Sequence, residues 1–480
     1  MSLRRNTALN LTGQVISVAV SLAAVPPLLR MIGEARYGVL LIAWVLLGYF
    51  ALFDLGVGQA TSQRMAILRS GTPEERGRLV WTALVMNAAM GVAAALILFV
   101  VAHVVLGSVV SMDAALRSES LAALPWIALA LPLSMVGSVF SGALQGREAF
   151  GAAAIVSTLG QVVAQGAPLL VAWRYSTSLA WLIPAALSSR VVTSLLGFLL
   201  CRNAVPLRNL AGFDLGSAKR LLSYGGWITV SSIVGPLMTS LDRLVIGNIS
   251  GTEAVTYYGV PQGLTSRTLM LPASLSGALM PRLASEGVER RATLMDKSVK
   301  AVASVMTPAV VLGITLAGTF LGFWIGPEFA AKATAAAQVL FVGVWFNGMA
   351  MLAHSALLAK GRPDRIARMH LIELPCYLAT LAIALRLWGV TGAAVAWALR
   401  VSVDAVLLFR MAGVLEASAR ALWIPTLALA GALVSARLQT YVPLLGWSAS
   451  ASLAVGMAVW ALRTLPTELK LTWRARLPGA

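Results

Sequence analysis

Residues 224–272 read YGGWITVSSIVGPLMTSLDRLVIGNISGTEAVTYYGVPQGLTSRTLMLP, and this stretch decides the fold. Two apolar helical runs flank a short polar turn, Gly247 to Thr252. Each run is long enough to cross a bilayer, which takes about 20 residues of helix. The first run nevertheless carries Asp242 and Arg243, and the second carries Arg267 near its middle. A charge at the bilayer centre costs at least about 2.5 kcal/mol, so we expect these side chains to face protein or a wet cavity.

The composition indicates a membrane protein with many spans. Of the 480 residues, 58% are hydrophobic and 12% are charged, whereas a soluble protein carries about 25% charged residues. The net charge of +18 lies mostly in short links between apolar runs, not in a basic stripe that alternates with exposed aromatics. The charge therefore argues for cytoplasmic loops and against a nucleic-acid partner.

The hydrophobic pattern predicts an all-α polytopic membrane protein with about fourteen transmembrane helices. The expected helix limits are 9–31, 37–62, 79–106, 121–144, 151–173, 179–201, 221–247, 254–281, 299–325, 334–358, 366–387, 390–410, 421–437 and 443–462. With the N-terminus in the cytoplasm, Lys and Arg favour the inside segments over the outside segments by roughly four to one. This bias predicts that both termini are cytoplasmic.

An internal repeat predicts the domain organisation. Segment 32–39 (IGEARYGV) resembles segment 246–260 (IGNISGTEAVTYYGV), with Gly33 opposite Gly247, and the link 141–147 (SGALQGR) resembles 355–362 (SALLAKGR). The matches lie six helices apart, which keeps the two halves in the same orientation. A chance match of glycine-containing loops is the alternative. The predicted parts are a six-helix lobe over 1–203, a second over 204–412, and a helix pair with a cytoplasmic tail over 413–480.

Three arginines near the centres of predicted helices are the candidate substrate-binding residues: Arg190, Arg267 and Arg400. A guanidinium cannot shed its proton, and its planar donors suit phosphate and hydroxyl-rich ligands. A purely structural alternative exists, because four acids also lie in the apolar runs: Asp54, Asp242, Glu373 and Asp404. Asp404 follows Arg400 by one helical turn, so these two could pair.

Other polar residues in the apolar runs suggest further roles. Asn6, Asn10 and Gln14 lie on one face of the first helix, where they could line a hydrated cavity and contact substrate or could bridge to another helix. The acids Asp54, Glu373 and Asp404 are candidate ion-coupling residues, since desolvation makes a carboxyl group easier to protonate.

Several site types are not expected. His103 and His354 are isolated in the sequence, and a metal site needs several converging ligands. Cys201 and Cys376 are expected to be packing residues. No loop exceeds about 20 residues, so a separate catalytic domain has no room, and no Walker-type phosphate loop is present. We therefore predict no catalytic residues, no metal, no cofactor and no enzymatic activity.

Three stretches resemble a known family, and together they extend over most of the chain. They are PLLRMIGEARYG (27–38) with Gly48-Tyr49 and Asp54-Leu-Gly56; LDRLVIG (241–247) with Tyr258-Gly259; and AKGRP (359–363) through WGVTGAAVAW (388–397). These residues resemble the polysaccharide exporter and O-antigen flippase family, within the superfamily of multidrug, oligosaccharidyl-lipid and polysaccharide exporters.

The resemblance implies a flippase in the bacterial inner membrane. The implied substrate is an oligosaccharide linked to undecaprenyl diphosphate, moved by alternating access among membrane lipids. A proton or sodium ion is a candidate coupling ion, and a polymerase or glycosyltransferases of the same pathway are candidate partners. An ion-coupled multidrug exporter of the same fold is the alternative, which the three arginines disfavour. A membrane glycosyltransferase or polymerase is a third hypothesis, which the short loops disfavour.

Overall fold

The structure, a computed structural model, describes residues 3–68, 72–204, 213–285 and 288–465. These residues form helices and connecting turns, without a strand among them, which confirms the predicted all-α class. Ten of the described helices are long and apolar enough to cross a membrane. The chain divides into two compact units, Met1–Thr256 and Tyr257–Ala480. The predicted lobes, the C-terminal pair and the count of fourteen helices stay predictions.

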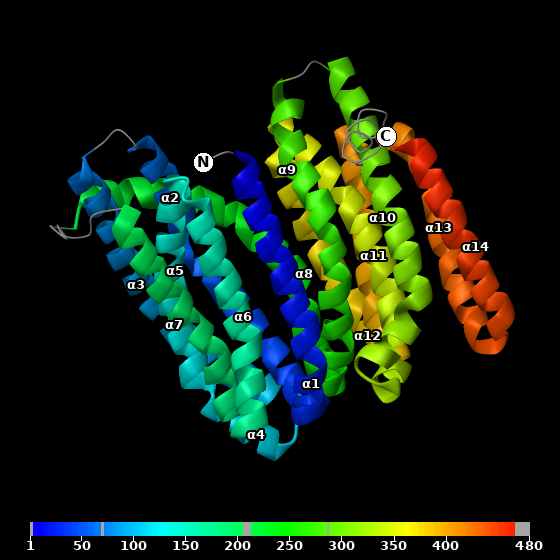
Figure 1. The fold of residues 1–480 in the computed structure, drawn as a ribbon, viewed down its shortest axis with the longest axis horizontal. Helices are drawn as coiled ribbons and strands as arrows, with labels where there is room; N and C mark the ends of the chain where they lie inside the picture. Colours follow the sequence, from blue (N-terminus) through cyan, green and yellow to red (C-terminus); the bar gives the residue numbers. More distant parts are fainter. Residues whose placement is uncertain (1–2, 69–71, 205–212, 286–287, 466–480) are drawn as a thin grey trace. The chain divides into compact units, whose positions relative to one another are not determined.

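The first unit is a bundle of long helices (Figure 1). Helix α5 packs against α3 on one side and α7 on the other, and α6 lies between α7 and α1. The elements that begin in this unit are α1 (Leu3–Phe50), η1 (Ala51–Asp54), α2 (Val57–Ile67), α3 (Pro73–Val104), η2 (Val105–Val109), α4 (Ala114–Ala122), α5 (Leu124–Gly146), α6 (Phe150–Arg174), α7 (Leu179–Ala204) and α8 (Leu215–Thr265).

The second unit is also helical, with α11 packed against both α10 and α12, and α13 packed against α14. Its elements are η3 (Ser266–Leu269), α9 (Met270–Ser285), α10 (Val288–Trp324), α11 (Pro327–Ala359), α12 (Pro363–Ala412), α13 (Leu415–Tyr441) and α14 (Pro443–Thr464).

Three of the longest helices bend at a glycine, at Gly33 in α1, Gly251 in α8 and Gly389 in α12. Each glycine lies between two predicted spans. Gly33 (φ 79°, ψ 164°) and Gly251 (φ 81°, ψ 175°) share a conformation that is essentially restricted to glycine. Gly251 therefore matches the backbone conformation of Gly33, whereas Gly247, the glycine that the sequence paired with Gly33, lies inside a regular helical segment. The repeat itself stays a prediction.

The predicted helix over 254–281 is interrupted. The 3₁₀ segment η3 separates α8 from α9, and Arg267 lies within it. The prediction of one continuous α-helix over this segment was therefore wrong. Periodicity counts apolar residues and does not detect a local change from α to 3₁₀ hydrogen bonding.

Contacts at one end of the first unit fix the segment of α1 that follows Gly33. Arg36 donates two hydrogen bonds to Glu119 of α4, at 3.0 and 2.8 Å. Thr256 donates to the backbone oxygen of Glu34 at 2.6 Å. Gly38 lies so close to the backbone oxygen of Thr252 that a Cβ would be 1.9 Å from it, so only glycine fits. These contacts anchor the α1 segment that carries Trp44.

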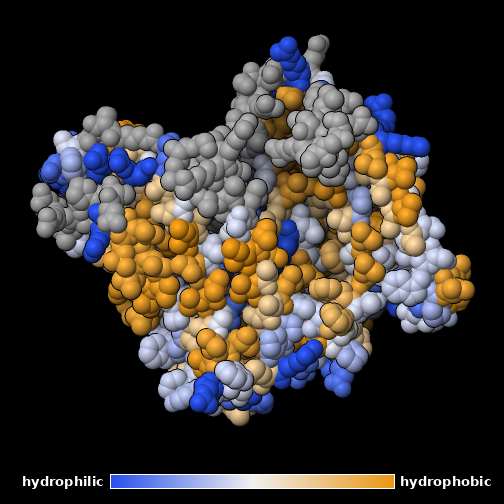
Figure 2. Space-filling view, in the orientation of Figure 1, coloured by the Kyte–Doolittle hydropathy of each residue, from blue (hydrophilic) through white to orange (hydrophobic). Residues whose placement is uncertain are grey.

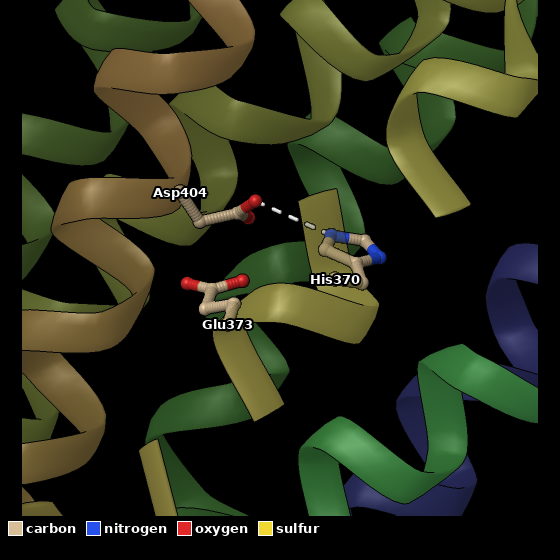
Figure 3. A group of neighbouring side chains, drawn as sticks. All are labelled: His370, Glu373 and Asp404. Carbon is tan, nitrogen blue, oxygen red and sulfur yellow. Dashed lines mark hydrogen bonds and ion pairs between the residues drawn. The ribbon is translucent and has the colours of Figure 1, made fainter. Parts of the chain in front are cut away.

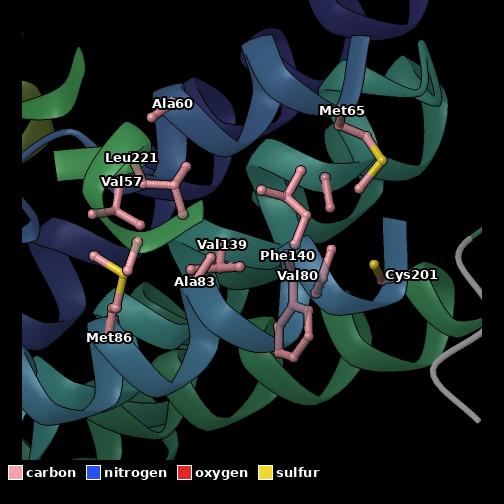
Figure 4. Packing of buried hydrophobic residues seen from close by; sticks show 13 residues of the cluster. Val57, Ala60, Met65, Val80, Ala83, Met86, Val139, Phe140, Cys201 and Leu221 are labelled. Carbon is pink, nitrogen blue, oxygen red and sulfur yellow. The ribbon is translucent and has the colours of Figure 1, made fainter. Parts of the chain in front are cut away.

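A hydrophobic cluster packs five helices of the first unit together (Figure 4). Helices α2, α3, α5, α7 and α8 each contribute at least one side chain to it. Its buried members are Val57, Ala60, Met65, Leu79, Val80, Ala83, Met86, Val139, Phe140, Ala143, Cys201, Ala218 and Leu221. Cys201 thus packs as an apolar residue, and both cysteines are free.

The outer surface of the first unit suits a bilayer. Apolar atoms form a band on the visible face of this unit, with hydrophilic atoms toward the helix ends (Figure 2). Exposed apolar side chains are frequent on α3, among them Leu96, Ile97 and Val100. Such a surface is unfavourable in water and favourable in lipid.

Candidate functional site

A polar pocket opens among the helices of the first unit, and we call it the Arg190 pocket. It has a volume of about 490 Å³ and is lined from α1, α5, α6 and α7. Its lining residues are Trp44, Leu47, Gly48, Ser134, Ser157, Gly160, Gln161, Ala164, Gln165, Ser189, Arg190 and Thr193. Hydroxyl, amide and guanidinium groups thus meet within apolar helices, where unsatisfied polar groups are costly.

Arg190 is the charged residue of this pocket. Among the described residues, its guanidinium makes no ion pair or hydrogen bond, and the side chain is exposed. The amides come from one face of α6, where Ser157, Gln161 and Gln165 recur every four residues. A free guanidinium beside amides, hydroxyls and the Trp44 ring can bind a ligand that carries both negative charge and hydroxyl groups.

Asp54 lies at the junction of η1 and α2, in a set of hydrogen bonds that we call the Asp54 site. Asn87 of α3 donates to its Oδ1, and Ser138 of α5 donates to the same oxygen at 3.0 Å. The backbone N–H of Gly58 donates to Oδ2 at 3.4 Å. The carboxylate therefore ties three elements together beside the hydrophobic cluster.

A second group of ionisable side chains lies along α12 in the second unit, and we call it the α12 cluster (Figure 3). It contains His370, Glu373, Arg400 and Asp404. The ligand atoms of the histidine and the two acids all lie within 4.8 Å of one another. The bend at Gly389 brings the segment with Asp404 back beside the segment with His370 and Glu373.

Two ionic contacts organise the α12 cluster. His370 Nε2 lies 3.3 Å from Asp404 Oδ1, and Arg400 Nε lies 3.9 Å from Glu373 Oε1. The predicted Arg400–Asp404 pairing along one turn is therefore replaced by a pairing across the bend. Arg400 also lies over the ring of Tyr377, 5.6 Å from its centroid.

Three predicted residues, Gln14, Asn10 and Arg267, are not among the described members of these groups. Gln14 is exposed on α1 and is absent from the described lining of the Arg190 pocket. Asn10 belongs to α1, but its side chain is outside the described part of the structure. Arg267 is half-buried in η3, and within the described residues it makes no ion pair. Their roles stay predictions.

Sequence reasoning missed several of these residues. His370 precedes Glu373 by three positions, a spacing that places both on one helix face. The stripe Ser157, Gln161 and Gln165 could likewise have been found by its four-residue period. The contact of Asp54 with Asn87 and Ser138 joins positions far apart in the chain, so no local pattern indicates it.

The sequence matches one family model and is similar to a curated transporter. A family model described as polysaccharide biosynthesis protein matches residues 3–286. A putative O-antigen transporter of Shigella flexneri is 28% identical over 409 residues, which cover 85% of this chain and 97% of the relative.

Solved structures share the fold at low sequence identity. The lipid II flippase MurJ, in an inward closed conformation, superimposes with a TM-score of 0.70 at 12% identity, covering 95% of this chain and 99% of that one. A multidrug resistance transporter of the MATE family, facing inward, gives a TM-score of 0.66 at 14% identity, covering 85% and 95%. The chain therefore shares its fold with these two transporters.

Proposed function

Because the chain belongs to the polysaccharide biosynthesis protein family, we propose that this multi-pass membrane protein moves a lipid-linked oligosaccharide across the bilayer. The name of the Shigella relative, a putative O-antigen transporter, supports this substrate class. The reaction makes and breaks no covalent bond. The protein has only to shelter the polar head of the substrate while the lipid tail stays in the membrane.

The observation that carries the proposal is the guanidinium of Arg190, which lies in a polar pocket and has no ion pair or hydrogen bond among the described residues. An oligosaccharide that crosses hydrocarbon alone loses water from every hydroxyl group, at several kcal/mol for each unsatisfied group. The amides and hydroxyls of the pocket can replace that water, and the guanidinium can pair with a phosphate oxygen. Trp44 adds an apolar face of the kind on which a sugar ring can rest.

The finer parts of the proposal follow from the resemblance and the charge pattern. The carrier lipid is undecaprenyl diphosphate, the membrane is the bacterial inner membrane, and both termini are cytoplasmic. Transport proceeds by alternating access and is coupled to a proton or sodium gradient through Glu373 and Asp404. A polymerase or glycosyltransferases of the pathway supply or consume the substrate, and the protein itself is not an enzyme.

The ion-coupled multidrug exporter remains the rival function, because the fold alone is compatible with it. A pocket for organic cations would use acidic or aromatic side chains. None of the described residues that line the Arg190 pocket is acidic, and one is a cation. The pocket thus favours an anionic, hydroxyl-rich substrate over a cationic drug.

The test replaces Arg190 in a bacterial strain whose surface polysaccharide depends on this protein. Arg190→Ala should reduce export at least about tenfold at unchanged protein level, and Arg190→Lys should restore part of it, since charge survives without the bidentate fork. Arg174→Ala, an exposed arginine at the end of neighbouring α6, is the matched control and should export normally. Normal export by Arg190→Ala would reject the pocket as the substrate site.

Arg267→Ala is a second test. If Arg267 contacts substrate, this variant should also lose export while it stays in the membrane at the parental level. If Arg267 instead neutralises a buried acid, the variant should be poorly folded, because the acid loses its partner. Parental export at parental level would remove Arg267 from the substrate path.

A further inference from the structure

We propose that a further pocket of the first unit, the Arg64 pocket, binds the head group of a phospholipid that carries a primary amine, of the phosphoethanolamine type. The pocket lies where α2 ends and α3 begins, and its volume is about 490 Å³. This volume is within the range of pockets that bind small molecules. The inference goes beyond the proposed function, because lipid binding can be measured without any export.

Charged side chains of both signs line the Arg64 pocket. They are Arg64 in the last turn of α2, Glu75 and Arg78 near the start of α3, and Asp214 just before α8. Glu75 and Arg78 are three residues apart and therefore share one face of α3. Because the two guanidiniums and the two carboxylates balance, the described lining suits a ligand that carries both charges and has no net charge.

The arginines of the pocket are available to a ligand. In the part of the chain that the structure describes, the side chains of Arg64 and Arg78 make no ion pair and no hydrogen bond. Glu75 accepts one hydrogen bond through Oε2, from the backbone N–H of Thr72 at 3.0 Å, and among the described residues none reaches its Oε1. The charges therefore line the same cavity without neutralising one another, which leaves donors for an anion and an acceptor for a cation.

A phosphoethanolamine head group complements this lining. Its phosphate oxygens accept charge-assisted hydrogen bonds from the two guanidiniums, and its ammonium donates hydrogen bonds to the carboxylates of Glu75 and Asp214. A choline head group has the same two charges but no N–H to donate. A glycerol head group lacks the positive charge and would leave the carboxylates facing a phosphate. The mixed lining thus selects the primary amine over both.

The surroundings of the pocket favour a lipid over a soluble phosphoester. Ile67, which lines the pocket, is 60% exposed, and Leu215, next to Asp214, is 61% exposed. Leu79, which also lines it, is buried in the hydrophobic cluster. The charge pattern predicts that this end of the helices lies at the cytoplasmic surface of the bilayer. A charged pocket with exposed apolar side chains beside it suits a head group whose acyl chains remain in the membrane.

Hydrogen bonds hold the two acids of the pocket in place before a ligand arrives. The capping box of α3 pairs the backbone N–H and hydroxyl of Thr72 with the carboxylate and backbone N–H of Glu75, at 3.0 and 3.3 Å. Asp214 Oδ1 accepts from the N–H of Gly216 at 3.1 Å, and the N–H of Asp214 donates to the hydroxyl of Thr82 at 3.2 Å. Groups that are fixed in this way lose little conformational freedom on binding.

The experiment measures thermal unfolding of the full-length protein in detergent micelles. The probes are phospholipids with identical short acyl chains and an ethanolamine, choline or glycerol head group. A ligand that binds the folded protein raises its unfolding temperature by mass action, so a titration gives each apparent Kd. We expect the ethanolamine lipid to bind at least about tenfold more tightly than the other two, the effect of one hydrogen bond to a charged group.

Variants test which side chains bind which part of the head group. Arg64→Ala and Arg78→Ala should each weaken binding of the ethanolamine lipid at least about tenfold. Glu75→Gln keeps the capping box, because the amide oxygen still accepts from Thr72. It removes a charge that faces the ammonium, so the preference for ethanolamine over glycerol should be lost. Arg202→Ala, an exposed arginine at the end of α7, is the matched control and should bind like the parent.

Equal affinity of the parent for the three head groups would overturn the proposal. So would a preference that survives in both arginine variants and in Glu75→Gln, because the lipid would then bind elsewhere. Free phosphoethanolamine is the remaining probe: if it stabilises the protein as strongly as the lipid does, the pocket takes a soluble phosphoester and the lipid is rejected. Glu75→Gln keeps the test decisive where an arginine variant folds poorly. A protein that binds the ethanolamine lipid as expected but moves no glycan retains this site and loses the proposed function.

Discussion

The Asp54 site and the α12 cluster both contain partly or fully buried acids that the sequence marks as ion-coupling candidates, yet the surroundings of these acids differ. Asp54 accepts hydrogen bonds from Asn87, Ser138 and the backbone of Gly58. Glu373 accepts none among the described residues, and its ionic contact with Arg400 spans 3.9 Å. The carboxylate of Asp54 therefore accepts three hydrogen bonds from protein groups, and in the described part of the structure that of Glu373 accepts none.

This difference predicts that one acid contributes to the stability of the protein and the other to transport. A carboxylate that accepts several hydrogen bonds holds the elements that donate them together. A carboxylate without them can exchange a proton or an ion at little structural cost. We therefore expect Asp54 to contribute mainly to folding and Glu373 mainly to coupling. The coupling role of Asp54 stays a prediction from the sequence.

Replacing Asp54 should give the largest effect. Asp54→Ala leaves the side-chain donors of Asn87 and Ser138 and the N–H of Gly58 without their shared acceptor. We expect the free energy of unfolding to fall by about 3 kcal/mol, since each stranded buried donor costs about 1–3 kcal/mol. Unfolding in mixed detergent micelles measures this. Glu74→Ala, an exposed acid on α3, is the control and should change stability by less than about 1 kcal/mol.

An Asp54→Ala protein that unfolds like the parent but no longer exports would reverse the comparison. Asp54 would then be a coupling residue, as the sequence suggested, and its hydrogen bonds would serve to position it.

Replacing Glu373 should have a smaller effect, and it should change the rate of export and not the free energy of unfolding. Glu373→Gln keeps the shape of the side chain and removes a charge that, within the part of the chain that the structure describes, accepts no hydrogen bond. We expect the free energy of unfolding to change by less than about 1 kcal/mol. Export should fall at least about tenfold, which corresponds to about 1.4 kcal/mol. Transport assays with a proton or sodium gradient, normalised to protein level, measure it, and parental export would place coupling elsewhere.

Much of the fold could be predicted because the bilayer imposes simple rules. Hydrophobic runs of about 20 residues indicated the helices, and Gly33, Gly251 and Gly389 lie in the predicted gaps between them. The sequence paired Gly33 with Gly247, but Gly251 is the glycine that shares its backbone conformation, and a sequence pattern does not report backbone angles. The interruption at Arg267 was missed for the same reason.

The site could be predicted only in part. A charge in an apolar run is visible in sequence, which is why Arg190, Glu373 and Asp404 were predicted as site residues. Its partner is not visible when it comes from another helix or from across a bend. Arg400 pairs with Glu373 and Asp404 with His370, although the shortest spacing in sequence joins Arg400 to Asp404. Tertiary packing, not helical period, decides these pairs.

The smallest expected effect comes from Ser138, which contributes one of several hydrogen bonds at the Asp54 site. Ser138→Ala removes a donor to Asp54 Oδ1 and an acceptor for Asn87 Nδ2, at 3.0 and 3.1 Å. Asn87 and Gly58 still donate to the carboxylate, and Asn87 still donates to the backbone oxygen of Met135 at 2.9 Å. The free energy of unfolding should therefore fall by only about 1 kcal/mol.

Export per folded molecule should be unchanged in Ser138→Ala, and Ser141→Ala, one turn further along α5 and partnered by exposed Gln145, should match the parent in both respects. If Ser138→Ala instead leaves stability intact and makes export sensitive to pH, then the hydrogen bond controls the charge of Asp54 during transport. Asp54 would then take part in coupling, as the sequence predicted.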